Sequence, residues 1–383
     1  MFIIKRIYDS SAMKRFLFTF CAIIILIFVI LLAAEILIRL SGIFQYEYQD
    51  AKNEQFVQYN KLNFQGRIKS KGEYYNKFYF NKYGMRGKEI ELKKSTDFRI
   101  LCLGDSFTAA LQHPSEYTYP ALLDCKLKQN GFNAEVLNIS SEGVGTAIEY
   151  LYLLNLGLKF KPDLVILAYA FNDPRDDWLN KDKIILDNDS CPVMAKPFKK
   201  DTNVILNKSH LYRFQKDFFK KIRKGRKDKI IKTAQENWRN SDIGQNIFAI
   251  LRDKFSERDL KILNNSFRFL MCLKKTCKNN NIKLALVAIP PGVQVNANEW
   301  EKGKFLYGFN RSEFVQSDNW QSMLKEFCRE NEIPLLDLLP ILRKESKGDL
   351  YFDYDGHWTY KGHEIVSEAL FNFIKDNSLV SNP

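Results

Sequence analysis

Residues 99–108 read RILCLGDSFT, an apolar run that ends in a Gly, an Asp and two hydroxyl residues. The run shows no apolar–polar alternation, which is typical of a strand buried on both faces of a parallel sheet. Four further apolar runs follow, at residues 134–138, 163–170, 283–289 and 334–338. The segments between them are long enough for crossover helices, for example 119–129, 146–158 and 318–330. This alternation predicts an α/β fold, a three-layer αβα sandwich around a parallel five-stranded sheet.

Polar residues follow these strands, at the edge where ligands of such sheets bind. Ser106 follows the first strand, Gly143 the second and Asn172 the third, and DYDGHW at 353–358 precedes the last helical stretch. Gly-Asp-Ser by itself is common, and its plain interpretation is a strand-end turn with a capping Ser. A hydroxyl, a flexible Gly, a carboxamide and an Asp/His pair at successive strand ends instead favour acyl transfer.

The residue types fit that chemistry. A Ser hydroxyl needs a base to remove its proton, and His357 is the candidate base for Ser106. Asp355, two residues earlier, can fix the imidazole tautomer so that the other nitrogen faces the hydroxyl. The backbone N–H groups of Ser106 and Gly143 and the side-chain amide of Asn172 are candidate oxyanion donors.

At these residues the chain resembles the SGNH, or GDSL-type, hydrolase superfamily, over about residues 99–376. The resemblance implies a flavodoxin-like fold in a domain at 98–378, and ester hydrolysis or acyl transfer without a cofactor or metal. It implies the nucleophile at Ser106, oxyanion groups at Gly143 and Asn172, and the base at His357. The third block departs from the family pattern, because Ala170 stands where Gly is usual.

The triad acid is open between two residues. The family's last block usually reads Asp-x-x-His, but here Tyr354 stands three residues before His357. The acid is therefore Asp355, as in the Asp-x-His pattern of membrane-anchored, polysaccharide-acetylating relatives, or Asp353. Because the bond to the imidazole must be short and oriented, Asp355 is favoured.

An uncharged run of 19 residues at 16–34 predicts a transmembrane anchor at 16–38. Basic residues dominate the preceding flank, so residues 1–15 are expected in the cytoplasm and the catalytic domain outside it, in the periplasm or at the cell exterior. A cleaved signal peptide ending near Ala33 and Ala34 is the alternative. A buried globular helix is disfavoured, because the run has no polar face.

The net charge of +13 is concentrated at residues 199–229, where twelve basic residues face three Asp. The segment belongs to a predicted helical basic insertion at about 180–260, and residues 209–224 have the spacing of a basic amphipathic helix. It is either a solvated face or a contact for an anionic membrane surface or glycan. Nucleic acid is not expected as a partner outside the cytoplasm. Residues 39–97 are expected to be a connector with a small β portion.

Six of the seven Cys lie outside the apolar run, without zinc-ligand spacing, and no particular disulfide is predicted. His113 and His210 are expected to be exposed or loop residues, and His363 a surface or capping residue of the last helix. The leading hypothesis is a membrane-anchored serine esterase or acyltransferase acting on O-acyl, mainly O-acetyl, groups of an envelope or exported polysaccharide. The alternatives are a lipid or lysophospholipid esterase and a non-catalytic glycan-binding or assembly subunit. An α/β-hydrolase is disfavoured, because its Gly-x-Ser-x-Gly elbow requires Gly where Thr108 stands.

Overall fold

The computed structural model describes residues 11–41, 49–50, 59–70, 72–196, 209, 211–212, 214–215, 240–309 and 315–380. The chain divides into two compact units. One unit comprises residues 1–46 and 201–232, and the other comprises residues 47–200 and 233–383. The basic segment at 199–229 lies almost entirely outside the described residues, so its predicted amphipathic helix stays a prediction.

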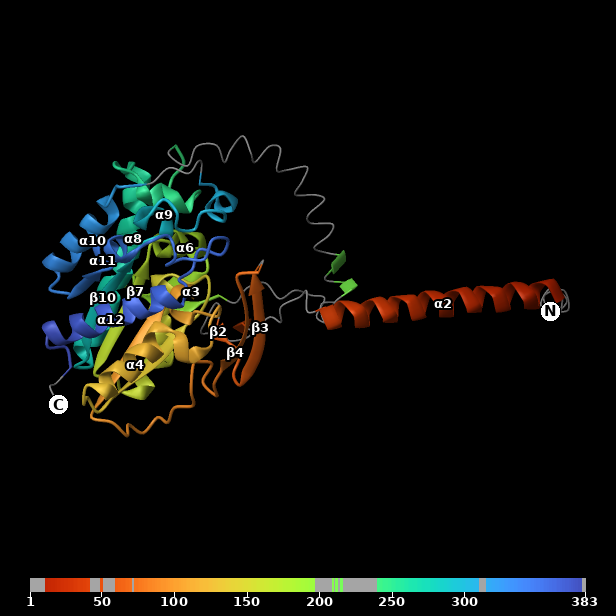
Figure 1. Ribbon diagram of the computed structural model, residues 1–383, viewed down its shortest axis with the longest axis horizontal. Coiled ribbons are helices and arrows are strands. Elements are labelled where there is room, and N and C mark those ends of the chain that lie inside the picture. Colours follow the sequence, from red (N-terminus) through yellow and green to blue (C-terminus); the bar gives the residue numbers. More distant parts are fainter. Residues whose placement is uncertain are drawn as a thin grey trace. The chain divides into compact units, whose positions relative to one another are not determined.

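The first unit contains a long helix, α2 (Ser11–Ser41), drawn in red in Figure 1. Its segment from Met13 to Leu40 has a mean hydropathy of 3.2, and none of its most apolar window is buried. The helix is long and apolar enough to cross a membrane, and the predicted anchor at 16–38 lies within it. A signal sequence has the same properties, so retention and orientation stay predictions.

The second unit is built on the predicted five-stranded parallel sheet, with strand order β11-β10-β7-β5-β6. The strands are β5 (Phe98–Gly104), β6 (Ala134–Ser140), β7 (Leu164–Ala170), β10 (Lys283–Ile289) and β11 (Leu335–Asp337). All residues of the central strand β7 are buried, as expected for an apolar strand covered on both faces, and all residues of the edge strand β6 are buried as well. Gly104 pairs with both Ser140 and Ala168, so β5, β6 and β7 end at one edge.

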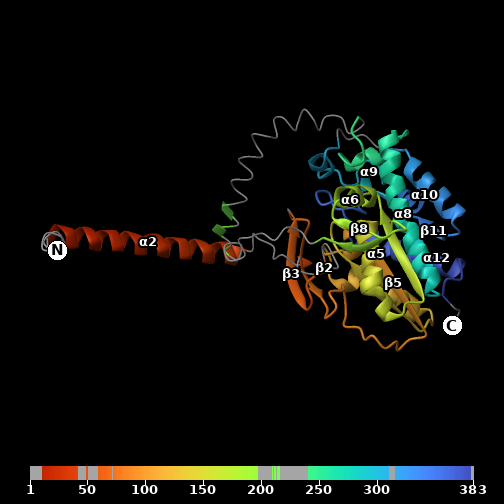
Figure 2. The same ribbon diagram turned by 180° about the vertical axis from the view of Figure 1, so that it is seen from behind.

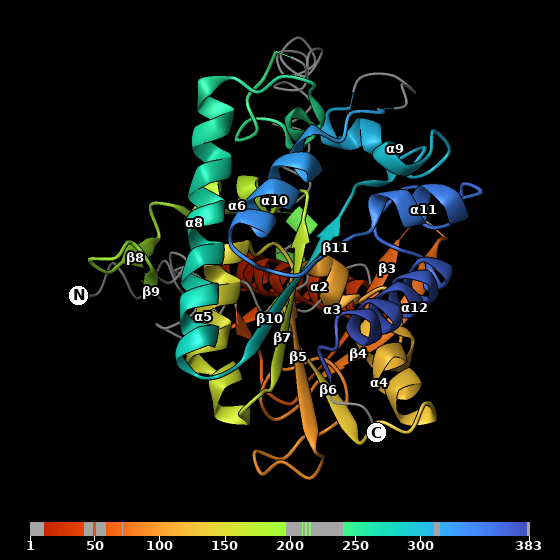
Figure 3. The ribbon, with the colours of Figure 1, turned by 90° about the vertical axis from the view of Figure 1, so that its left-hand side faces the viewer.

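Helices cover both faces of this sheet, which confirms the αβα sandwich (Figure 3). One face is covered by α5 (Thr146–Asn155), α8 (Glu257–Asn279) and α10 (Asn319–Glu330). The other is covered by α4 (Tyr119–Gln129), α11 (Leu339–Glu345) and α12 (Tyr360–Asp376). Short helices α3 (Ser106–Ala109), α6 (Asp173–Asn180) and α9 (Gly292–Val295) begin just beyond strand ends. Short 3₁₀ helices cover Ser115–Tyr117, Gly157–Phe160, Ile247–Leu251 and Lys304–Tyr307.

The connector contains more structure than the sequence indicates. Strands β1 (Gln49–Asp50) and β2 (Tyr59–Asn60) pair with each other. β3 (Phe64–Ser70) and β4 (Tyr74–Phe80) form an antiparallel hairpin, which we call the β3–β4 hairpin. Every second residue of β4 is buried from Asn76 onward, which fits a strand with one face on the body.

A second hairpin and a disulfide lie in the described part of the predicted insertion. β8 (Ile184–Leu186) pairs with β9 (Pro192–Ala195), and the hairpin lies beside α5 (Figure 2). Cys191, directly before β9, forms a disulfide with Cys272 of α8. The bridge joins residues 81 positions apart and ties this hairpin to the helical layer.

Candidate active site

Ser106 is the first residue of α3, immediately beyond β5. The turn is capped by Asp105, whose Oδ1 accepts a hydrogen bond from the Phe107 backbone N–H at 2.9 Å. Gly104 is needed for the close approach of the helix to the strand, since a Cβ there would lie 2.1 Å from the Thr108 Oγ1. This strand–turn–helix geometry leaves the Ser106 side chain partly exposed at the edge of the sheet.

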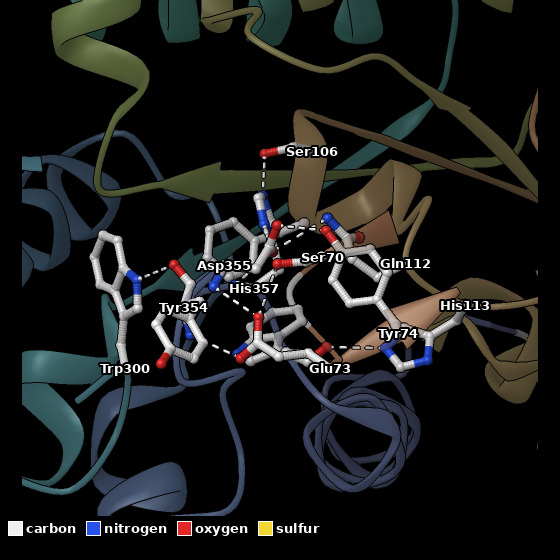
Figure 4. Close-up of polar contacts among 12 residues, drawn as sticks. Ser70, Glu73, Tyr74, Ser106, Gln112, His113, Trp300, Tyr354, Asp355 and His357 are labelled. Carbon is white, nitrogen blue, oxygen red and sulfur yellow. Dashed lines mark hydrogen bonds and ion pairs between the residues drawn. The ribbon is translucent and has the colours of Figure 1, made fainter. Parts of the chain in front are cut away.

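The structure brings Ser106 and the Asp/His loop together, although 251 residues separate Ser106 from His357 (Figure 4). Ser106 Oγ lies 2.7 Å from His357 Nε2. His357 Nδ1 hydrogen-bonds to Asp355 Oδ1, so the tautomer with a proton on Nδ1 leaves Nε2 free to accept from the Ser hydroxyl. Asp353 instead pairs with Lys302 at 2.8 Å on the surface. The structure therefore places Asp355, not Asp353, at the imidazole.

The loop that carries Asp355 and His357 is packed tightly from one side. Gly356 has φ +84°, and a Cβ there would lie 2.3 Å from the Trp300 ring. The Trp300 indole N–H donates to the Tyr354 carbonyl at 3.3 Å. Trp358 is fully buried, with its ring 4.9 Å from that of Phe107. The loop is therefore held in one conformation by a Gly that accepts positive φ and by aromatic packing.

Electrostatics couple the two members of this loop. Burial alone raises the pKa of Asp355, but the charge of His357 and its hydrogen bond outweigh burial and lower that pKa. Burial alone lowers the pKa of His357, and the Asp355 carboxylate outweighs it and raises that pKa above its ordinary value. The pair therefore favours a carboxylate next to an imidazole that readily holds a proton, as a general base requires.

The candidate oxyanion donors differ in availability. Gly143 lies exposed in the loop after β6 with φ +69°, a conformation that favours Gly. Asn172, the residue before α6, uses its amide to donate to Asp105 Oδ2 at 2.8 Å and to Asp176 Oδ2 at 2.9 Å. Both amide hydrogens are therefore engaged by carboxylates, and a bond from Asn172 to an oxyanion requires one of them to be exchanged.

Buried carboxylates cluster near Asp105, at the same edge of the sheet. Asp105, Glu149, Asp173 and Asp177 are each 0–2% exposed. Within the described part of the chain, Glu149 has no hydrogen-bond partner for either carboxylate oxygen. Burial, followed by repulsion from Asp105, raises the pKa of Glu149 well above its ordinary value. Among the residues that the structure describes, no three His, Cys, Asp or Glu side chains are grouped to hold a metal ion.

Two His residues are more buried than the sequence indicates: His113 lies in a loop, as expected, but is buried, and His363 lies in the first turn of α12 but not at its surface. His113 and His363 are 9% and 1% exposed, and His210 lies outside the described residues. His113 Nε2 hydrogen-bonds to the Trp358 carbonyl at 2.9 Å, and His363 Nδ1 accepts from the Tyr119 backbone N–H at 3.3 Å. Burial lowers the pKa of both groups, which keeps them neutral in the packing beneath the site. An isolated His among polar neighbours, in a loop or in the first turn of a helix, carries no local signal of such burial.

Sequence analysis also missed residues that contact Asp355. Tyr74 and Gln112 donate hydrogen bonds to its carboxylate, at 2.7 and 3.3 Å. Glu73 accepts hydrogen bonds from the backbone N–H groups of the loop that carries Asp355. No spacing links Glu73 and Tyr74 to residue 355, because they lie more than 280 positions away.

Comparisons with known proteins find similarity to an SGNH hydrolase-like family model and to esterases. Residues 251–382 match a family model described as SGNH hydrolase-like domain, acetyltransferase AlgX. An arylesterase from Vibrio mimicus is 36% identical over 75 residues, which are 20% of this chain and 38% of that protein. The chain thus spans about two fifths of the length of this curated relative.

Solved structures of esterases are similar over most of the body, with low scores. The psychrotrophic esterase EstA from Pseudoalteromonas sp. is 15% identical, with 74% of this chain and 99% of that chain covered at a TM-score of 0.38. An acetyl xylan esterase is 13% identical, with 72% and 98% covered at a TM-score of 0.38. The matched family model includes Asp355 and His357, and the sheet places Ser106 against them. The similarity to the SGNH hydrolase-like family model therefore covers the segment that carries two of the three residues brought together here.

Proposed function

We propose that this protein is a serine esterase or acyltransferase that forms an acyl-enzyme on Ser106. The observation that carries the proposal is the 2.7 Å contact between Ser106 Oγ and His357 Nε2, with Asp355 on the opposite imidazole nitrogen. A hydroxyl, a base and an orienting acid in this order are the parts that nucleophilic acyl transfer requires.

In the proposed first step, His357 removes the Ser106 proton while the hydroxyl oxygen attacks the ester carbonyl. The Asp355 carboxylate stabilises the imidazolium that forms, and the imidazolium then protonates the departing alcohol. The backbone N–H groups of Ser106 and Gly143 are the proposed donors to the developing oxyanion, and each such donor lowers the barrier by about 3–4 kcal/mol. Asn172 joins them when one of its two carboxylate bonds is exchanged. In the second step, His357 removes a proton from water or a sugar hydroxyl while its oxygen attacks the acyl carbon. The bond from that carbon to Ser106 Oγ then breaks, and the imidazolium returns the proton to the serine.

We further propose that the substrate is an O-acyl group, mainly O-acetyl, of a polysaccharide outside the cytoplasm. The acetyltransferase description of the matching family model supports the acyl group and leaves the glycan as an inference. The apolar helix α2 supports a membrane location. The Cys191–Cys272 disulfide supports an oxidising compartment, because such bonds persist outside the cytoplasm.

The test uses the purified full-length chain in detergent micelles. A fluorophosphonate probe should label the wild type and should not label Ser106→Ala. Product analysis with an acetylated oligosaccharide, with and without free sugar acceptors, separates hydrolysis from transfer. Absence of serine labelling together with retained glycan binding would overturn the proposal in favour of a binding subunit. Turnover of long-chain acyl esters and not of acetyl esters would overturn the substrate assignment in favour of a lipid esterase.

A further inference from the structure

The β3–β4 hairpin precedes the sheet and lies outside the family match, yet its turn reaches the triad acid (Figure 4). Tyr74, the first residue of β4, donates its hydroxyl hydrogen to Asp355 Oδ2 at 2.7 Å. The other carboxylate oxygen, Oδ1, bonds to His357 Nδ1. The phenol and the imidazole therefore hold the carboxylate between them, with one oxygen facing each.

The Tyr74 hydroxyl is suited to donate and not to ionise. Burial, followed by the charge of the Asp355 carboxylate, raises the pKa of Tyr74 far above its ordinary value. Its ring packs against Phe352, with 5.1 Å between the ring centroids, which restricts its rotation. A hydrogen bond from a neutral hydroxyl to a carboxylate is of the stronger, charge-assisted kind, so it also fixes the direction of Asp355.

Glu73, one residue earlier, holds the backbone of the same loop. Its Oε1 accepts from the Tyr354 N–H at 2.7 Å, and its Oε2 accepts from the Asp355 N–H at 3.2 Å. The Ser70 hydroxyl donates to Oε2 at 3.1 Å and orients this carboxylate. Two successive amides bound by one carboxylate fix the peptide plane between them. Glu73 therefore fixes the backbone position of Asp355, and with it the place of the carboxylate.

The hairpin also contacts the nucleophile's side of the site. Ile68, Phe78 and Phe80 of the hairpin are buried in one apolar cluster with Ala109 and Leu111. Ala109 is the last residue of the helix that begins with Ser106, and Leu111 follows two positions later. This packing ties the hairpin to the helix that carries the hydroxyl.

Polar contacts strengthen the same junction. The buried Asn76 side chain donates to the carbonyls of Leu111 and His113, at 2.8 and 2.5 Å. Gln112, the residue between them, donates from Nε2 to Asp355 Oδ1 at 3.3 Å. The hairpin thus reaches the carboxylate directly through Tyr74 and indirectly through the loop that Asn76 holds.

We propose that the β3–β4 hairpin is a clamp that keeps the Ser106 helix and the Asp355–His357 loop in register, with Tyr74 and Glu73 as positioning residues. The inference rests on the proposed function, because it assigns a task within that catalytic site. It requires that catalysis depends on residues outside the sheet domain. A hairpin that served stability alone would leave the protonation of His357 unchanged when the Tyr74 hydroxyl is removed.

The first experiment compares Tyr74→Phe with Tyr79→Phe in the full-length chain. Tyr79 is a matched control, because its hydroxyl also donates to a carboxylate, that of Glu89, within the same hairpin region. Tyr74→Phe is expected to lower kcat about tenfold with little change in KM, the effect of losing one hydrogen bond to a charged group. Tyr79→Phe should match the wild type.

A pH measurement separates positioning from stability. Without the Tyr74 hydroxyl, the Asp355 charge is less shared and attracts the imidazolium more strongly, so the pKa of His357 should rise. The acid limb of the kcat/KM profile should then move to higher pH by roughly 0.5 unit. The same shift should appear in an NMR titration of the chain's four His residues, with selective isotope labelling.

Glu73 provides an independent check. Glu73→Ala removes both acceptors and should lower kcat about tenfold, whereas Glu73→Gln keeps one acceptor oxygen and should recover part of the loss. Unchanged kcat, pH profile and His357 titration in Tyr74→Phe would overturn the clamp and leave the proposed function standing. If the wild type itself hydrolyses no ester, the proposed function fails, and the NMR titration still decides whether Tyr74 controls the Asp355–His357 pair.

Discussion

The five-stranded sheet buries charged side chains both at the amino ends and at the carboxyl ends of its strands, which we call its amino edge and its carboxyl edge. The two edges differ in how those charges are compensated. At the amino ends of β5 and β6, the Arg99 guanidinium is 1% exposed and pairs with Glu135 at 2.6 Å. The same group donates to the carbonyls of Phe160 and Leu92, at 2.6 and 3.1 Å. This edge follows the usual rule that a buried ion is paired and fully hydrogen-bonded.

At the carboxyl edge, acids accumulate without matching cations. Asp105, Glu149, Asp173 and Asp177 form no ion pair with any Lys or Arg that the structure describes. The pKa of each of them is raised, and burial is the largest cause. This is also the edge from which Ser106 emerges. The charges at the amino edge therefore stabilise the fold. The unpaired acids at the carboxyl edge destabilise it, next to the groups that react.

The sharpest test of this division is Ser106→Ala. We expect a loss of at least about 10⁴-fold in kcat for an acetyl ester, because the nucleophile is removed and only binding and oxyanion contacts remain. The unfolding midpoint should stay close to that of the wild type, since the side chain is partly exposed. Ser115→Ala is the control, because Ser115 is also partly exposed and its hydroxyl donates to Glu116 and not to the triad. Residual activity within tenfold of the wild type would break the assignment of the catalytic edge.

The next largest effect should separate the two candidate acids. Asp355→Asn is expected to lower kcat by roughly 10³–10⁴-fold, because the amide favours the wrong imidazole tautomer. Asp353→Asn should change kcat by less than about threefold, because Asp353 forms only an exposed pair with Lys302. Steady-state kinetics on both variants decide the point. The reverse order of effects would show that the loop rearranges on binding substrate.

At the opposite edge, Arg99→Met should change stability and leave turnover intact. Removing one member of a buried pair leaves the Glu135 carboxylate without its partner, which costs about 3–5 kcal/mol. The double variant Arg99→Met, Glu135→Leu should recover a large part of that loss. Denaturant unfolding of the body, followed by kcat at a temperature where the variant is folded, provides both readouts. A tenfold fall in kcat of the folded variant would contradict the division between the edges.

The sheet was predictable from sequence because its signal is local. Five uninterrupted apolar runs specify strands buried on both faces, and the five strands were confirmed within a few residues. The positions of Ser106 and His357 followed from the rule that ligands bind beyond the carboxyl ends of parallel strands. Local pattern combined with one topological rule was sufficient for these elements.

The supports of the loop were not predictable for the opposite reason. Tyr74 and Glu73 hydrogen-bond to the loop of Asp355, more than 280 residues away in the sequence. Nothing in the sequence of a Tyr-rich connector indicates which distant loop its turn will contact. The Cys191–Cys272 bridge likewise joins elements whose proximity depends on how a hairpin packs on a helix. Such contacts are set by tertiary packing, which composition and periodicity do not encode locally.

The smallest predicted effect addresses the uncompensated acids directly, through Glu149→Gln. The pKa of Glu149 is raised in the folded state, so the folded protein retains a proton that the unfolded chain releases. Stability from this group is therefore complete below the ordinary Glu pKa and is lost as pH rises towards the raised value. Gln keeps the shape and removes the titration, so it should stabilise the body clearly at pH 8 and by little at pH 5.

The measurement is denaturant unfolding of wild type and Glu149→Gln at both pH values, with Glu345→Gln as a control on the exposed end of α11. Burial, followed by repulsion from Asp105, raises the pKa of Glu149, so the uncharged Gln resembles the form that the site favours and kcat should change less than about threefold. A stability difference of equal size at pH 5 and pH 8 would show that Glu149 does not hold the proton. Glu149 would then not destabilise the carboxyl edge, and the contrast with the amino edge, where Arg99 lies, would lose its strongest support.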